Sequence, residues 1–368
     1  MRNKIESASA FTLLSLAIVI FLLSTGSSAA SQEQPTVAKD SVQATAFTFN
    51  VYRGSYDTWS WVPKLEYRVN GPIPSGGQLY AEFTIPGGTA LKFDCPTEET
   101  QAGRWWKTEC GGRKVPEDKG STYTGGVQFA IKLRNELAGT DATLFTGRMK
   151  VVKARPGGPV VPNHFVYYVD QDWKLPIGYV YLTPNDLKGW ERPNFHVAFW
   201  TRGAYNGSFQ PHLFYQGKEV SKKFFEGREV GKPVCDPEAE NGTTLTVADT
   251  VPQKATWVRV RCTFFNVQGW DKTGEAPGLF GPPYTLNDNP GEYEIKVLWN
   301  NRLARSIKFT IGADGKLDER TALANKLGSN RSVVPIQIIG EQDGPWDRAA
   351  WKTEAFYGNP LTGFTASP

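Results

Sequence analysis

Two pairs of aspartates have the spacing that hydrolytic chemistry would need. Asp170 and Asp172 lie two positions apart, so an extended chain would hold them on one face about 6–7 Å apart. Asp343 and Asp347 flank a Gly-Pro-Trp segment near the C-terminus. Glycoside hydrolysis requires two carboxyl groups at a fixed separation, and either pair would also suit a sugar or Ca²⁺. Because acids in loops are more often solvated turn formers, a polysaccharide hydrolase is kept as an alternative.

The sequence contains none of the usual signatures of other catalytic or cofactor sites. No G-x-S-x-G turn presents a nucleophilic serine, and the three histidines at positions 164, 196 and 212 form no metal-binding spacing. His196 falls on the polar face of an alternating stretch and is expected at the surface. No glycine-rich phosphate loop opens a helix. We therefore predict no cofactor, no metal site and no enzymatic activity.

The tryptophans indicate a recognition surface. Seven of the 12 are candidates for flat aromatic rings exposed near polar or turn residues, which proteins use to bind sugars and partner proteins. Core packing is the alternative, and Trp200, Trp257 and Trp299 fit it best. The candidate binding residues are Trp59, Trp61, Trp106, Trp173, Trp190, Trp270 and Trp346.

The first 30 residues have the features of a secretory signal peptide. Arg2 and Lys4 form a basic start, residues 11–23 are almost entirely apolar, and Ser28 and Ala30 stand at a small-residue cleavage site. An uncleaved anchor is the alternative, but these 13 apolar positions span only about 20 Å of a roughly 30 Å hydrocarbon core. No later segment is apolar enough to span a membrane. We expect an extracytoplasmic protein, periplasmic or secreted, cleaved near Ala30.

The four cysteines predict two disulfide bonds, because an even number in an exported chain implies pairing. Three connectivities are possible. We prefer Cys95–Cys110 together with Cys235–Cys262, since each bond then closes within one domain. A redox or metal pair is disfavoured, because no C-x-x-C motif occurs and no histidine lies close in sequence to either pair.

Apolar and polar residues alternate along much of the chain, which predicts many short antiparallel strands. Val127, Phe129, Ile131 and Leu133 form one such row. The segment 155–162 contains three prolines and two glycines, a composition typical of a linker. We predict a mainly β fold with two antiparallel β-sandwich domains, at residues 31–154 and 163–312, joined by this linker.

The two predicted domains contain similar hairpins. GGVQFAIKLRNEL, ending at Leu137, and PGEYEIKVLWNNRL, ending at Leu303, share a turn glycine, an aromatic residue, Ile-Lys and an Asn-containing turn. A tandem duplication explains this similarity, and chance likeness is the alternative. The hairpins resemble the closing strands of Ig-like and fibronectin-III-like modules in exported bacterial proteins, which implies the fold alone. Cys95 and Cys110 depart from the antibody pattern, since their spacing is too short for a bond between sheets across the core.

The hydrophobic period changes after residue 312. Residues 316–327 carry Leu317, Ala324 and Leu327 at helical spacing, which predicts a short amphipathic helix. Residues 333–339 are expected to form a strand with its proline at an edge position. The rest of the segment 313–368 is rich in aromatic residues, and we expect it to dock on the body as a C-terminal extension.

These patterns favour a non-enzymatic interaction protein that recognises a protein or glycan at the cell envelope. The 41 basic and 37 acidic residues are spread along the chain, which argues against a nucleic-acid partner. The polysaccharide hydrolase described above is one alternative, and a purely structural envelope component is the other.

Overall fold

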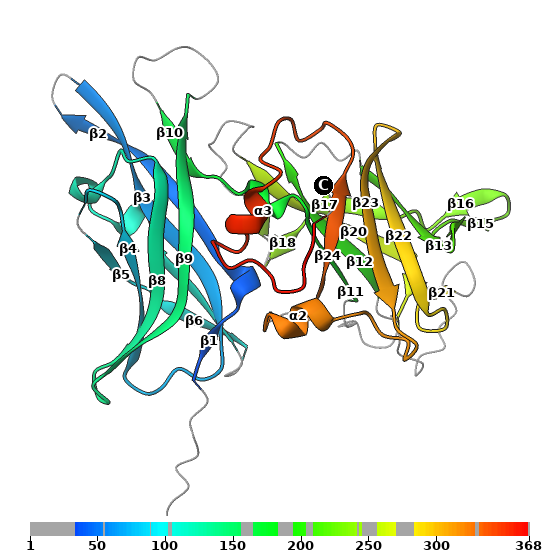
Figure 1. Cartoon of the computed structure of the whole chain (residues 1–368), viewed down its shortest axis with the longest axis horizontal. Coiled ribbons are helices and arrows are strands. Elements are labelled where there is room, and N and C mark those ends of the chain that lie inside the picture. Colours follow the sequence, from blue (N-terminus) through cyan, green and yellow to red (C-terminus); the bar gives the residue numbers. More distant parts are fainter. Residues whose placement is uncertain are drawn as a thin grey trace, which may run out of the picture.

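Figure 1 shows two β-sheet bodies side by side, with the C-terminal segment between them. The computed structural model describes residues 34–53, 56–88, 90–101, 105–155, 165–182, 194–203, 209–240, 243–244, 256–269, 283–327 and 331–366. The predicted signal peptide and nearly all of the predicted linker lie outside these residues. Strands dominate and helices are short, which confirms the predicted mainly β fold. In the described part of the chain, no helix is long and apolar enough to cross a membrane.

The first body is a sandwich of two sheets. One sheet contains, in order, β1 (Thr36–Val37), β3 (Tyr56–Asn70), β7 (Trp105–Gly111) and β6 (Thr97–Gln101), with β2 (Gln43–Arg53) also paired to β3. The other contains, in order, β10 (Val166–Val169), β9 (Thr140–Ala154), β8 (Gly125–Asn135), β4 (Gly77–Thr84) and β5 (Leu91–Asp94). Short 3-10 turns accompany them at Lys39–Ser41, Gly112–Lys114 and Glu117–Lys119.

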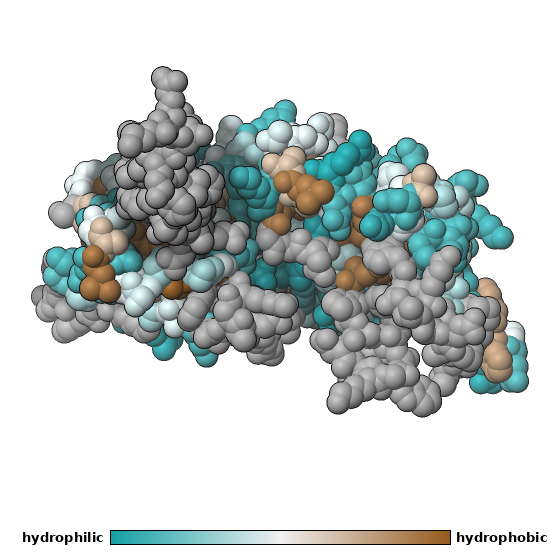
Figure 2. Space-filling view, turned by 90° about the horizontal axis from the view of Figure 1, so that it is seen from below, coloured by the Kyte–Doolittle hydropathy of each residue, from teal (hydrophilic) through white to brown (hydrophobic). Residues whose placement is uncertain are grey.

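Alternation along the strands builds the core of this sandwich. The predicted row on β8 is buried throughout, because residues two apart on a strand share one face. Gln128 and Arg134, at intervening positions, are exposed on the opposite face. The phenyl rings of Phe83 and Phe129 lie 5.8 Å apart between neighbouring strands. Seen from below, the part of the surface that belongs to described residues is mostly hydrophilic with small hydrophobic patches (Figure 2).

The second body is a ten-stranded sheet that curls back on itself. Its order is β14 (Lys218–Glu219), β13 (Phe209–Tyr215), β22 (Gly291–Trp299), β23 (Arg302–Ile311), β24 (Ser332–Ile338), β11 (Ile177–Leu182), β12 (Asn194–Arg202), β20 (Trp257–Gln268) and β17 (Val234–Pro237), with β21 (Tyr284–Thr285) beside β20. The ring of Phe195 on β12 lies 5.1 Å from that of Phe309 on β23, so two halves of the sheet enclose a second core. Two small hairpins form separate two-stranded sheets, β15 (Lys223–Phe225) with β16 (Arg228–Val230) and β18 (Ala239–Glu240) with β19 (Thr243–Thr244).

Strand β24 lies inside the second sheet, although the sequence places it in a C-terminal extension at an edge. Residues 332–335 pair with β11, and residues 336–338 pair with β23. Pro335 has no N–H to donate, and it stands where the pairing with β23 has not yet begun. The proline is therefore accommodated at a change of neighbours within a central strand.

The boundary between the two bodies also differs from the predicted one. Strand β10, expected in the second domain, pairs with β9 of the first. The C-terminal segment returns to the first body, where Phe356 and Tyr357 are buried in its core. The hydroxyl of Tyr357 accepts a hydrogen bond of 2.8 Å from the backbone N–H of Ala44. Each body is thus completed by chain that lies outside its predicted limits.

The predicted helix at 316–327 is shorter than expected. Helix α2 (Arg320–Ala324) begins later because Leu317 forms a β-bridge with Ile311 at the end of β23, which keeps the preceding residues extended. Helix α3 (Ala350–Thr353) is a second single turn in the C-terminal segment. The predicted docking of this segment on the body is confirmed by the buried side chains of Leu361 and Phe364.

Strand pairing follows the same order in both bodies. In the first, β2 pairs with β3, β3 with β7 and β6 with β7, while β5, β4, β8, β9 and β10 form a continuous series. In the second, β11, β12, β20 and β17 repeat the first set, and β14, β13, β22, β23 and β24 repeat the second. The hairpins singled out in the sequence, β8–β9 and β22–β23, occupy equivalent places in the two series.

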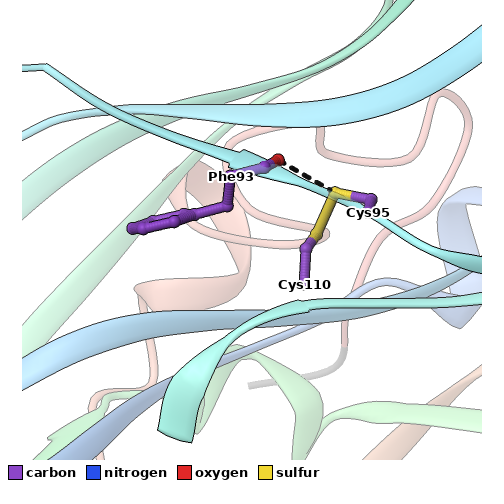
Figure 3. Close-up of a disulfide and its surroundings, with 3 residues drawn as sticks. All are labelled: Phe93, Cys95 and Cys110. Carbon is purple, nitrogen blue, oxygen red and sulfur yellow. Dashed lines mark hydrogen bonds between the residues drawn. A yellow bond between two sulfur atoms is a disulfide. The ribbon is translucent and has the colours of Figure 1, made fainter. Parts of the chain in front are cut away.

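Both predicted disulfides are present. Cys235 and Cys262 are directly opposite each other on β17 and β20. Cys95 follows β5 of one sheet and Cys110 lies on β7 of the other, so their bond joins the two sheets of the first sandwich (Figure 3). The expectation that their spacing was too short for an inter-sheet bond was wrong, because the chain crosses between the sheets directly after β5.

Removing the inter-sheet disulfide should lower stability. A variant with Cys95→Ala and Cys110→Ala loses a cross-link that closes a loop of 15 positions, and we expect its free energy of unfolding to fall by about 2–4 kcal/mol. Urea unfolding followed by circular dichroism measures this change. Replacing both Cys235 and Cys262 by alanine is the matched comparison, with a similar expected loss. A decrease below about 1 kcal/mol would contradict the prediction.

Candidate functional site

The four candidate tryptophans whose side chains are described do not form an exposed strip. Trp61 and Trp173 are buried, with 0% and 4% of their surface exposed, so they cannot serve as surface binding residues. Trp59 and Trp346 are half-buried against the two cores. The side chain of Trp106 and the whole of Trp190 and Trp270 lie outside the described part of the structure.

The burial of Trp61 and Trp173 has a clear physical cause. Trp61 faces into the first sandwich, and its indole N–H donates a hydrogen bond of 2.8 Å to the carbonyl of Tyr123. Trp173 lies in a 3-10 turn (Asp172–Lys174), where its ring packs 5.1 Å from that of Phe356 in the returning C-terminal segment. Both indole rings therefore have partners inside the protein: a backbone carbonyl for Trp61 and an aromatic ring for Trp173.

Three of the four candidate aspartates meet where the two bodies join. The N–H of Asp172 donates to a carboxylate oxygen of Asp170 at 3.2 Å, and the N–H of Asp347 donates to Asp172 at 2.9 Å. Arg202 approaches the other oxygen of Asp172 at 3.5 Å, and Lys150 pairs with Asp170 at 3.3 Å. Burial and the neighbouring charge of Asp170 raise the pKa of Asp172 to about 6. This cluster fastens the C-terminal segment to the chain after β10.

Asp343 has other partners than Asp347 and serves a different purpose. Its carboxylate binds the guanidinium of Arg305 at 2.6 Å, and both side chains are buried. It also accepts hydrogen bonds from the Thr201 hydroxyl at 3.1 Å and from the N–H of Arg202 at 2.8 Å. With all of these donors directed at it, Asp343 is a structural counter-ion, whereas Asp347 belongs to the cluster with Asp170 and Asp172.

His196 is buried in a polar network, although the sequence predicts it at the surface. Its ring stacks on Tyr181 with centroids 5.2 Å apart, and its Nδ1 lies 3.0 Å from the Thr263 hydroxyl. Burial, reinforced by Arg261, lowers the pKa of His196 to about 4, so the ring is neutral at pH 7. Nearby, Arg331 binds the buried carboxylate of Glu238 at 2.8 Å. The outer face of β12 is therefore an interface within the protein rather than a free surface.

A cavity of about 570 Å³ at the end of the second body combines aromatic rings with polar groups. We call it the Tyr215 pocket. Tyr215 and Tyr284 form its aromatic part, with ring centroids 6.5 Å apart. The residues that line it are Tyr215, Gln216, Lys218, Glu219, Val220, Tyr284 and Asn289.

Local chain geometry fixes the two tyrosines of this pocket. Tyr215 ends β13 directly before a two-residue turn, Gln216–Gly217, in which both residues have positive φ as hairpin turns of this kind require. Its ring lies 4.9 Å from that of Tyr293 on the neighbouring strand, and its hydroxyl donates to the Pro290 carbonyl at 3.0 Å. The hydroxyl of Tyr284 lies 3.1 Å from that of Tyr293. The aromatic wall is thus held in place before any ligand arrives.

The charges around the Tyr215 pocket leave its rim positive. Glu219 is bound by Lys222 at 2.9 Å and by His212 at 2.7 Å. Burial alone raises the pKa of Glu219, but these hydrogen bonds outweigh it and hold the pKa below its ordinary value. Lys218 is exposed beside this neutralised carboxylate. An anionic ligand would therefore meet Lys218 first.

A second depression, of about 710 Å³, lies on the outer face of the first sandwich. Strands β4, β8 and β9 form its floor, and the turn after α3 forms one side. Glu82 and Lys132 within it are paired with each other at 2.8 Å. Neither this depression nor the Tyr215 pocket is lined by the clustered aspartates.

Comparison with known proteins gives no further guidance. No protein family matches the chain, and no curated protein is detectably similar to it. The Tyr215 pocket was not found from the sequence, because Tyr215 on β13 stands in the same alternating pattern as the core residues Phe209 and Leu213. The signal that could have indicated it is the Tyr-Gln-Gly-Lys hairpin turn at 215–218, which places an aromatic ring next to a tight turn.

The buried carboxyl of Asp172 should make stability depend on pH. Because its pKa is about 6 in the folded protein and near 3.8 when unfolded, the native state holds a proton that the unfolded chain releases between these values. Stability from this group is therefore lost as pH rises through this window. We expect Asp172→Asn to gain stability relative to the wild type as pH rises from 4 to 7, by about 1–3 kcal/mol.

Urea unfolding at pH 4, 5, 6 and 7 measures this difference. Glu136→Gln, in an exposed turn, removes one negative charge elsewhere and controls for the change in net charge. A difference between Asp172→Asn and the wild type that is the same at every pH would contradict the prediction.

Proposed function

We propose that this protein is an extracytoplasmic, non-enzymatic binding protein that recognises a glycan in the Tyr215 pocket. The observation that carries the proposal is the pairing of two preorganised tyrosine rings with amide, carboxylate and ammonium groups around one cavity. Sugar rings present C–H faces that pack on aromatic rings and hydroxyls that bond to polar side chains. A pocket of this composition suits a sugar better than a purely apolar ligand.

Binding is favoured over hydrolysis by the number of carboxyl groups. Glu219 is the one carboxylate among the described residues that line the pocket, and it is already engaged by His212 and Lys222. Glycoside hydrolysis needs a second carboxyl group about 5–9.5 Å away. The three clustered aspartates instead hold the two bodies together, as their hydrogen bonds show. The hydrolase alternative therefore receives less support than recognition.

The location and origin of the protein form part of the same proposal. Two disulfides fit an oxidising compartment, as the sequence of residues 1–30 predicts for an exported protein. The matching order of strand pairing in the two bodies supports a tandem duplication of one Ig-like sandwich. In this view one copy kept a role in packing against the C-terminal segment, and the other acquired the aromatic pocket.

Loss of a pocket tyrosine should weaken glycan binding. The exported chain is tested against a panel of envelope polysaccharides, and affinity for the best ligand is measured by titration calorimetry. We expect Tyr215→Ala to lower this affinity about tenfold, because the sugar loses its stacking surface. Tyr215→Phe keeps the ring and should bind nearly as well as the wild type.

Phe214→Ala is the matched control, because this neighbouring residue on β13 faces the other side of the sheet. No binding to any member of the panel, or equal binding by Tyr215→Ala, would overturn the proposal. Release of shorter sugars from a polysaccharide would support the hydrolase instead.

The exposed charge at the rim predicts a preference for acidic sugars. We expect Lys218→Gln to weaken binding of a uronic-acid oligosaccharide about threefold to tenfold and to leave a neutral oligosaccharide nearly unaffected. The same variant should lose most of the salt dependence of binding. Lys308→Gln, exposed on β23, is the control. An equal effect of Lys218→Gln on both sugars would show that the Lys218 ammonium group does not favour acidic sugars over neutral ones.

A further inference from the structure

The β15–β16 hairpin projects from the second body and exposes two adjacent phenylalanines. It forms a two-stranded sheet that pairs with no other strand among those described, and Figure 1 shows it standing out at the end of the molecule. Phe224 and Phe225 are 64% and 49% exposed. Large apolar side chains on an isolated hairpin contribute little to folding, so their exposure indicates a role in interaction.

The base of the hairpin is attached rigidly to the main sheet and adds to the apolar surface. The side-chain amide of Asn266 on β20 donates to the carbonyls of Val230 and Gly231, at 2.9 and 3.0 Å. Val234 pairs with Thr263, and Phe265 lies two positions further along, so Val234 and Phe265 share the outward face of the sheet. They are 44% and 48% exposed. Figure 2 shows hydrophobic side chains at this end of the molecule.

Basic residues surround the phenylalanines. Residues 222–232 carry Lys222, Lys223, Arg228 and Lys232 against Glu226 and Glu229, so the segment has a net positive charge. Glu229 is already paired with Lys232 at 3.2 Å. Arg228 lies directly opposite Phe225 on the neighbouring strand, so the two side chains share one face of the hairpin. Exposed aromatic rings with cations beside them are complementary to an anionic lipid surface, where the rings enter the acyl boundary and the cations meet phosphates.

We propose that the β15–β16 hairpin inserts Phe224 and Phe225 into an anionic lipid surface. Its size fits this role, because strands of three residues reach about 10 Å, which matches the depth of the headgroup and acyl boundary. The Tyr215 pocket lies near the base of the hairpin, because Glu219 of the pocket is bound by Lys222, the residue directly before β15. Insertion would therefore hold the pocket close to the membrane. This inference does not depend on the pocket's ligand.

Vesicle flotation tests the inference with the exported chain, from which residues 1–30 have been removed. We expect binding to vesicles of equal phosphatidylglycerol and phosphatidylcholine, and weak binding to phosphatidylcholine alone. Replacing Phe224 and Phe225 together by serine should reduce partitioning at least about tenfold, because two rings no longer leave water. Leu137→Ser, which alters a residue 81% exposed on the first body, is the matched control and should change partitioning less than twofold.

A second pair of changes tests the contribution of charge. Lys223→Gln with Arg228→Gln should weaken binding to the anionic vesicles about tenfold and abolish its dependence on salt. Circular dichroism and intact disulfides verify that each variant is folded. Absence of vesicle binding by the wild type, or equal binding by the serine variant, would overturn the inference. Vesicle-independent capture of a purified envelope protein that the serine variant loses would assign the hairpin to a protein partner instead.

Discussion

The charge of Arg305 has to be neutralised inside the protein, and much of the architecture depends on how this is done. Its side chain is fully buried, and a buried guanidinium without a partner would be strongly destabilising. Asp343 supplies the counter-charge from the chain that follows β24, and it also binds Thr201 and the backbone of Arg202 on β12. One ion pair therefore fixes the position at which the C-terminal segment leaves the second body. From there Asp347 reaches Asp172, and Tyr357 enters the first core.

The two bodies differ in how their two halves are joined, although their strands pair in the same order. In the second body, β24 pairs on both sides and joins the two halves of the sheet. In the first body, the equivalent strand β10 pairs with β9, while its contact with β2 includes two hydrogen bonds between the Thr48 hydroxyl and the backbone of Tyr167. The opening left beside β9 is covered by the C-terminal segment, whose Tyr357 carbonyl accepts a hydrogen bond from the N–H of Arg148.

Local signals in the sequence predicted local structure well. The period-two row at Val127–Leu133 gave a correct strand, and the spacing of the cysteines gave the correct pairs. Features set by distant chain were not predictable in this way. Alternation cannot say whether the polar face of a strand meets water or another sheet, so His196 and Trp61 were misplaced. The aspartate cluster needed residues 170, 172 and 347 to meet, and only the path of the whole chain brings them together.

The central position of β24 determines when the second body can form during synthesis. Ile177, at the start of β11, pairs with Pro335 on β24. The two halves of the sheet therefore cannot join until almost the whole chain has been synthesised. Such long-range pairing makes folding slow, because the chain loses the entropy of closing a long loop before the new contacts stabilise it. A chain truncated before residue 332 would leave the edges of β11 and β23 open to aggregation.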